Sequence, residues 1–190
     1  MATKLLILLG TKKGLFILES DAARRDWAQR GPYCEAWPIC HAIADPRTGT
    51  IHAGGGNDWF GPAVWTSADL GAIWTHSSEG LAYAAGETPI RAVWSLAKGP
   101  GGALYAGVEP AGLFRSDDGG DTWRPRNSGI RCDYLPEDQR YPEYGQCVHG
   151  LAMAPGMPDR LYQQNHCGMY RSDDGGRSWR SICTVFGFSS

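Results

Sequence analysis

Several features that would point to a common function are missing from this sequence. No apolar run approaches the ~20 residues that a membrane-spanning helix requires, and no window keeps the 3.6-residue apolar period of an amphipathic helix. The formal net charge of -2 over 190 residues leaves no basic surface for nucleic acid. We therefore expect a soluble protein with few helices, no membrane or nucleic-acid partner and no cofactor.

Targeting and metal signals are also weak. The apolar core at 5–9 is shorter than the ~7–15 residues of a signal peptide, and no small-residue cleavage site follows it. A cytoplasmic location is expected unless further residues precede Met1. The six cysteines include no Cys-x-x-Cys pair, so no metal site is predicted, and disulfides are disfavoured. The segments 147–149 and 166–167 carry Cys beside His and could converge between strands, but buried thiols and packed histidines are the expected outcome.

What the sequence does contain is a repeated turn. RSDDGGDTW at 115–123 returns as RSDDGGRSW at 171–179, and SADLGAIW at 67–74 keeps the pattern Ser-x-Asp-x-Gly-x-x-Trp, which we call the box. A fourth, eroded copy keeps only Ser20 and Trp27. The box tryptophans fall at 27, 74, 123 and 179, in steps of 47, 49 and 56 residues. A near-regular period of this size indicates a repeat architecture.

Each repeat is built from short segments rich in aromatic and β-branched residues, bounded by Gly, Pro, Asp or Asn, which favours strands. Four antiparallel strands in a unit of this length predict a propeller blade. We expect one all-β domain over 1–190, a β-propeller of about four four-stranded blades, forming a closed small ring or a partial propeller. The units span approximately 3–31, 38–80, 90–130 and 145–190, and the first lacks its innermost strand, so the chain looks shortened. Unpaired strand edges would then favour a homodimer.

The box chemistry suits a tight reversal between the third and fourth strands. Glycine supplies a positive φ, aspartate accepts backbone N–H groups, and the indole packs on the blade. Calcium binding is a poor alternative, because the box lacks the regularly spaced oxygen ligands of an EF-hand loop. The residues assigned this structural role are Ser67, Asp69, Gly71, Trp74, Ser116, Asp118, Gly120, Trp123, Ser172, Asp174, Gly176 and Trp179.

These boxes resemble the Asp box, or bacterial neuraminidase (BNR) repeat, of sialidase-like β-propellers. The wider unit is similar to bacterial BNR-repeat proteins labelled glycosyl-hydrolase-like, which are related to a photosystem II assembly-factor family. The resemblance covers nearly the whole chain and implies a propeller fold, whereas Asp boxes occur in enzymes and non-enzymes alike.

Propeller geometry places the second-to-third-strand turns and the long inter-blade connections on the face opposite the boxes. Long loops of this kind usually bind something. The ligand-binding candidates on that face are Asn57, Asp58, Trp59, Arg91, Glu109, Tyr134, Asn165 and His166, with Asp133 and Glu137 nearby. His41, Trp94 and His149 are aligned with one another in the first strands and are expected to ring the axis or pack between blades.

Two functions remain open at this point. The resemblance does not carry over catalytic residues, because the Phe/Tyr-Arg-Ile-Pro motif of sialidases is absent. We therefore expect a scaffold that binds a glycan, a small polar ligand or a protein partner. The alternative is a glycoside hydrolase, exo-sialidase-like or other, in which Glu109 pairs with Asp58 or Glu137.

Overall fold

The computed structural model describes residues 4–130 and 147–183, and within these ranges the chain forms fifteen strands and no α-helix. The first sheet contains β1 (Lys4–Thr11), β2 (Gly14–Asp21) and β3 (Ala28–Tyr33). The second contains β4 (Ile39–Ala44), β5 (Ile51–Asn57), β6 (Gly61–Ser67) and β7 (Thr75–Ser77). The third contains β8 (Ala92–Lys98), β9 (Leu104–Glu109), β10 (Gly112–Ser116) and β11 (Arg124–Pro125). The fourth contains β12 (Gly150–Met153), β13 (Leu161–Asn165), β14 (Gly168–Ser172) and β15 (Arg180–Ser181).

All strand pairs are antiparallel and follow chain order within each sheet. Short 3-10 turns cover Cys34–Ala36 and Pro100–Gly102. The predicted all-β fold, with three strands in the first unit and four in each of the others, is confirmed. None of the described residues forms a helix long and apolar enough to cross a bilayer.

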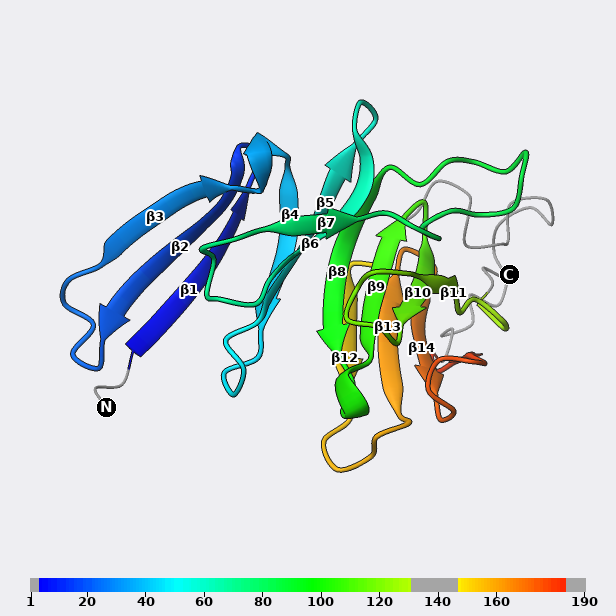
Figure 1. The fold of residues 1–190 in the computed structure, drawn as a ribbon. Coiled ribbons are helices and arrows are strands. Elements are labelled where there is room, and N and C mark those ends of the chain that lie inside the picture. Colours follow the sequence, from blue (N-terminus) through cyan, green and yellow to red (C-terminus); the bar gives the residue numbers. More distant parts are fainter. Residues whose placement is uncertain (1–3, 131–146, 184–190) are drawn as a thin grey trace, which may run out of the picture.

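The four sheets lie one after another in chain order, with the first and the fourth at opposite ends of the array (Figure 1). Neighbouring sheets meet through the first one or two strands of each, since β1 contacts β4, β4 and β5 contact β8, and β8 contacts β12. This is the blade-to-blade packing of a propeller, arranged as an arc with two separate ends. At the first end, Ile7 and Leu9 on the outer face of β1 are 45% and 47% exposed.

The apolar core is divided among the three junctions between sheets. Between the first and second sheets, Leu15 and Ile17 pack with Ile51 and Trp65. A second cluster around Val93, Leu104, Phe114 and Trp123 joins the second and third sheets, and a third around Tyr105, Leu113, Leu161, Tyr170 and Trp179 joins the third and fourth. Burial is thus shared between neighbouring blades rather than contained within each one.

The three complete boxes share one hydrogen-bond arrangement. The serine hydroxyl donates to the box aspartate at 2.7–2.8 Å and accepts the N–H of the box glycine at 2.8–2.9 Å. Each box joins the third strand of its sheet to the fourth. In the box at 116–123, the hydroxyl and backbone N–H of Thr122 both donate to Asp118 and hold the pKa of that carboxyl well below its usual value. The boxes are turns that their own side chains lock.

The tryptophan of the box also connects one sheet to the next. The backbone N–H of Trp123 donates to the carbonyl of Glu79, at 2.9 Å, and that of Trp179 donates to Ser128, at 2.8 Å. Both acceptors lie in the turn that follows the fourth strand of the preceding sheet. The indole N–H groups differ, because Trp74 and Trp123 donate to the carbonyl of their own box glycine whereas Trp179 donates to Arg126.

Candidate functional site

The turns that join the second and third strands of each sheet lie at the opposite end of these hairpins from the boxes. In the second sheet, Asn57 pairs with Gly61 beside the turn, while Ser67 opens the box at the far end of β6. The β9–β10 and β13–β14 turns occupy the same place in their hairpins. We call this side of the molecule the turn end. It carries the candidate residues of the second, third and fourth sheets.

Three of the predicted residues form one charged group at the turn end. The Arg91 guanidinium lies between two carboxylates, with Nε 3.0 Å from Asp58 Oδ1 and Nη1 3.7 Å from Glu109 Oε1. The other oxygen of Glu109 accepts the indole N–H of Trp94 at 2.5 Å. The backbone N–H of Arg91 donates to the Glu109 carbonyl at 2.7 Å, so main chain as well as side chain holds this arrangement. Arg91 and Asp58 remain largely open to solvent.

The β5–β6 turn presents two aromatic side chains beside this group. The Asn57 carboxamide oxygen accepts the backbone N–H groups of Trp59 and Phe60, both at 2.9 Å. The indole of Trp59 projects into solvent and is 87% exposed, while Phe60 is 51% exposed and stacks on Trp37 with ring centroids 4.8 Å apart. Asn57 therefore fixes the turn that holds Trp59 outward.

Irregular pairing in the innermost strands decides which side chains face this region. The β4–β5 register shifts between Ile39 and His41, and the β8–β9 register shifts between Val93 and Ser95. The bulged residues are thus Cys40 and Trp94, both exposed. The alignment of His41 with Trp94 was therefore wrong by one residue, because a bulge inserts an extra residue and re-aims its neighbours.

His41 links the second sheet to the third. Packing between blades was one of the two placements expected for it from the sequence. Its Nδ1 accepts the backbone N–H of Leu96 at 3.0 Å, and burial lowers its pKa.

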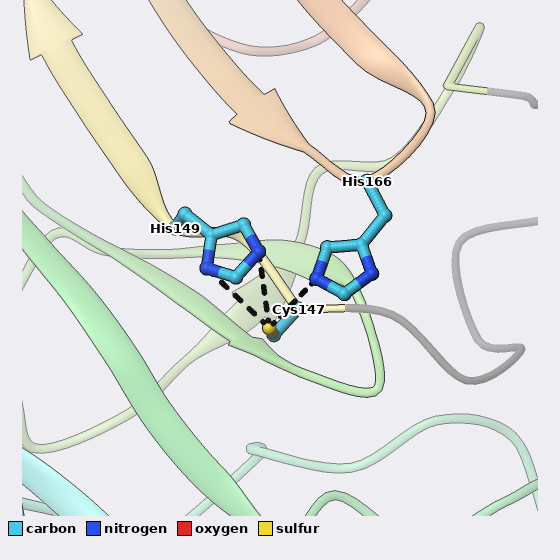
Figure 2. A group of neighbouring side chains, drawn as sticks. All are labelled: Cys147, His149 and His166. Carbon is cyan, nitrogen blue, oxygen red and sulfur yellow. Dashed lines mark hydrogen bonds between the residues drawn. The ribbon is translucent and has the colours of Figure 1, made fainter.

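A second group at the turn end consists of Cys147, His149 and His166 (Figure 2). The imidazole rings stack with centroids 4.5 Å apart and planes 12° from parallel, and the Cys147 sulfur lies close to both. The Trp94 and His149 rings lie edge to face with their centroids 6.0 Å apart, which links this group to Glu109. Burial raises the pKa of Cys147 to about 11, with smaller contributions from the nearby Glu109 and Cys40.

The remaining predicted residues have different outcomes. Asn165 is 4% exposed, and its side-chain oxygen accepts the backbone N–H of Cys167 at 2.8 Å, so it shapes the β13–β14 turn from inside. Tyr134, like Asp133 and Glu137, lies outside the described residues. Sequence reasoning did not select Cys40, whereas it named the segments 147–149 and 166–167 as able to converge, and they do. Matching the prolines that end the first segments, Pro46, Pro100 and Pro155, would have aligned Cys40 with Trp94 and His149.

The expectation about disulfides was wrong at one cysteine. Cys167, next to His166, is disulfide-bonded, whereas Cys34, Cys40, Cys147 and Cys183 are free. The expectation rested on the expected compartment and core size, neither of which reports whether two thiols lie close enough to bond.

Comparisons with known proteins give structural likenesses that are distant. No family model and no curated protein matches the chain. Among solved structures, it is similar to one described as YCF48 bound to a D1 peptide, with 16% sequence identity and a TM-score of 0.39. The match covers 90% of this chain and 62% of that one, so the present chain spans less than two thirds of its length. A likeness this distant carries no information on ligands or activity.

Proposed function

We propose that this chain is an Asp-box repeat propeller whose turn end binds a peptide segment of a protein partner. The observation that carries the proposal is Trp59, an indole held in solvent by a turn that Asn57 locks, beside the Arg91 group. Tryptophan and arginine are the residues most enriched among the energetically dominant contacts of protein interfaces. Here both stand on a rigid scaffold.

The rigidity of the turn favours binding. A side chain that is already oriented loses less conformational freedom on association, and each rotamer-rich side chain that must be ordered costs about 0.5–1.5 kcal/mol. The two hydrogen bonds from Asn57 fix the backbone of the turn, and the stack on Trp37 fixes Phe60. The turn end therefore offers an apolar anchor next to donors and acceptors, the combination that an extended peptide requires.

The geometry favours binding over glycoside hydrolysis. A glycosidase holds its two carboxylates on either side of the scissile bond, with open space between them for the sugar. The space between Asp58 and Glu109 is occupied by the Arg91 guanidinium, which contacts both. The observed arrangement is an ion-pair network rather than a cleft. The third carboxylate considered, Glu137, lies outside the described residues.

The test is a peptide selection followed by affinity measurements. The purified chain is first examined by light scattering, because a doubled mass would identify a second copy as the partner instead. Random peptides displayed on phage are then selected on the chain. Dissociation constants of the selected peptides are measured by calorimetry for wild type, Trp59→Ala and Arg91→Ala. We expect each variant to weaken binding at least tenfold, equivalent to about 1.4 kcal/mol.

Ile73→Ala is the matched control, because Ile73 is an apolar side chain, 71% exposed, in the box at the other end of β6. It should leave the affinity unchanged. The proposal fails if selected peptides bind Trp59→Ala as tightly as wild type, or if no peptide is selected while a glycan array gives a signal. Turnover of a fluorogenic glycoside panel, lost in Glu109→Gln, would restore the hydrolase alternative.

A further inference from the structure

The turn end contains three side chains whose metal-binding atoms converge. Cys147 and His149 lie just before β12, and His166 belongs to the turn between β13 and β14 (Figure 2). One atom from each, the thiol sulfur and one ring nitrogen of each histidine, lies within 4.8 Å of the other two. Cys147 is buried, whereas both histidines are exposed, so the group opens to solvent on the histidine side.

The spacing matches that of ligands around one tetrahedral metal ion. With a Zn–S bond of ~2.3 Å and a Zn–N bond of ~2.05 Å, a tetrahedral angle puts sulfur and nitrogen about 3.6 Å apart. The Cys147 sulfur is 3.6 Å from either ring nitrogen of His149 and 3.7 Å from Nε2 of His166. The sulfur is thus near enough to both rings, but it is equally far from the two nitrogens of His149, so that ring must turn before one nitrogen points at a shared ion. Rotation of the exposed rings can bring their nitrogens to the about 3.4 Å that two imidazoles on one zinc adopt.

The main chain holds these positions without a metal. The N–H of Val148 donates to Val108 at 3.2 Å, and its carbonyl accepts the Ser95 hydroxyl at 2.9 Å, which fixes the segment between Cys147 and His149. The N–H of His149 donates to Gln164 in β13 at 2.9 Å, so the two elements that carry the histidines are tied together. Asn165 closes the turn on the other side of the group. Preorganised ligands of this kind lower the ordering cost of binding.

The Cys147 thiol cannot donate a hydrogen bond to both rings at once. A thiol has a single, weak donor, and it can serve one nitrogen at a time. The Cys147 sulfur nevertheless lies within 3.7 Å of nitrogens on two stacked rings. One cation placed among the three can take all of them as ligands once the stacked rings turn toward it. A thiolate with two imidazoles is a donor set that suits Zn²⁺, and three protein ligands leave a fourth position for water.

We propose that Cys147, His149 and His166 bind one Zn²⁺ ion, with water in the fourth position. Binding converts the Cys147 thiol to a thiolate and releases its proton to solvent. The site is independent of the peptide-binding proposal, since neither Trp59 nor Arg91 contributes a ligand.

Cobalt is the probe that tests the site. Co²⁺ is titrated into the full chain in buffer free of thiols and chelators, and the absorption spectrum is recorded. We expect saturation at one ion per chain, with a thiolate-to-cobalt charge-transfer band and the intense visible bands of four-coordinate cobalt. Cys147→Ser should abolish the charge-transfer band. His149→Ala and His166→Ala should each weaken Co²⁺ and Zn²⁺ binding more than about 100-fold, because loss of even an outer-shell partner typically costs 10–100-fold.

Matched controls are Cys40→Ser and His76→Gln, which change an exposed cysteine and an exposed histidine outside the group. Both should keep the wild-type spectrum and affinity. Circular dichroism and urea unfolding of the metal-free variants show whether each is folded, and Zn²⁺ should raise the unfolding temperature of wild type and controls only. The site is refuted if no saturable binding occurs, if folded variants of the three residues bind like wild type, or if the controls lose binding equally.

Discussion

The junction between neighbouring sheets gives a sharp prediction at Gly80. This glycine has φ +78, and a Cβ added to it would lie 2.1 Å from the carbonyl oxygen of Trp123, more than 1 Å inside normal contact distance. It stands next to Glu79, whose carbonyl accepts the backbone N–H of Trp123. Gly80→Ala therefore forces the preceding turn away from the box it contacts. The matched substitution is Gly119→Ala, because Gly119 has φ +81 but nothing within 4 Å of its Cβ position.

The two substitutions share one cost and differ in another. A left-handed conformation costs an alanine about 1–2 kcal/mol, and the reduced freedom of the unfolded chain returns about 0.4–1 kcal/mol. Gly119→Ala should therefore lower the free energy of unfolding by about 1 kcal/mol. Gly80→Ala adds the loss of a hydrogen bond to a buried residue, about 1–3 kcal/mol, and looser packing of Trp123, which is 3% exposed. We expect a total of about 3–5 kcal/mol.

Urea unfolding at pH 7 is the assay, followed by both tryptophan fluorescence and circular dichroism so that coincident transitions verify two-state behaviour. An unchanged slope with a lower midpoint identifies a change in stability alone. If Gly80→Ala costs no more than Gly119→Ala, the hydrogen bond between Glu79 and Trp123 does not join the sheets and the junction described above is wrong. The junction between the third and fourth sheets allows the same test, since a Cβ on Gly129 would lie 2.2 Å from the Trp179 carbonyl oxygen.

Two further predictions concern buried polar groups. Ser116→Ala removes the acceptor for the N–H of buried Gly120, and should lower the free energy of unfolding by about 2 kcal/mol in the same urea assay; a loss below about 0.5 kcal/mol would show that the box does not depend on its serine. Burial lowers the pKa of His52 to about 4, with a further contribution from Lys98. Because the folded pKa is below the unfolded value of ~6.5, the unfolded state binds more protons, and wild type should lose up to about 3 kcal/mol as the pH falls from 6.5 to 4. His52→Gln should remove that part of the pH dependence, and an unchanged profile would contradict it.

The sequence predicted the fold because its local signals agree with one another. The boxes mark each third-to-fourth-strand turn, and the short segments between them can only be strands. The turn end was also predictable in part, since the ends of equivalent hairpins meet, and Asp58, Arg91 and Glu109 do lie together. The alignment of the first strands was wrong by one residue, because His41 rather than Cys40 was matched with Trp94.

Two β-bulges determine which side chains of the inner strands face the turn end. A bulge at Cys40 and another at Trp94 re-aim the inner strands, and no local composition announces them. The convergence of Cys147, His149 and His166 was considered from the sequence but not expected to form a metal-binding group. Its ligands come from a Cys-x-His segment and from the turn of a neighbouring hairpin, so their proximity depends on strand pairing rather than on any contiguous spacing.

Glycines at equivalent positions of β1, β5 and β9 mark where each sheet receives the next one. A Cβ on Gly10 would lie 2.6 Å from the Ile39 carbonyl oxygen, and one on Gly54 would lie 2.5 Å from Val93. A Cβ on Gly107 would lie 2.6 Å from Val148, so at each junction the following inner strand occupies the space of a missing side chain. By its pairing with Met169 across the hairpin, the equivalent residue of the fourth sheet is Gln164, and it is exposed. The fourth sheet thus carries a glutamine at the position where the other three carry a glycine. A further sheet that packed on the fourth in the same way would require the Gln164 side chain to move aside.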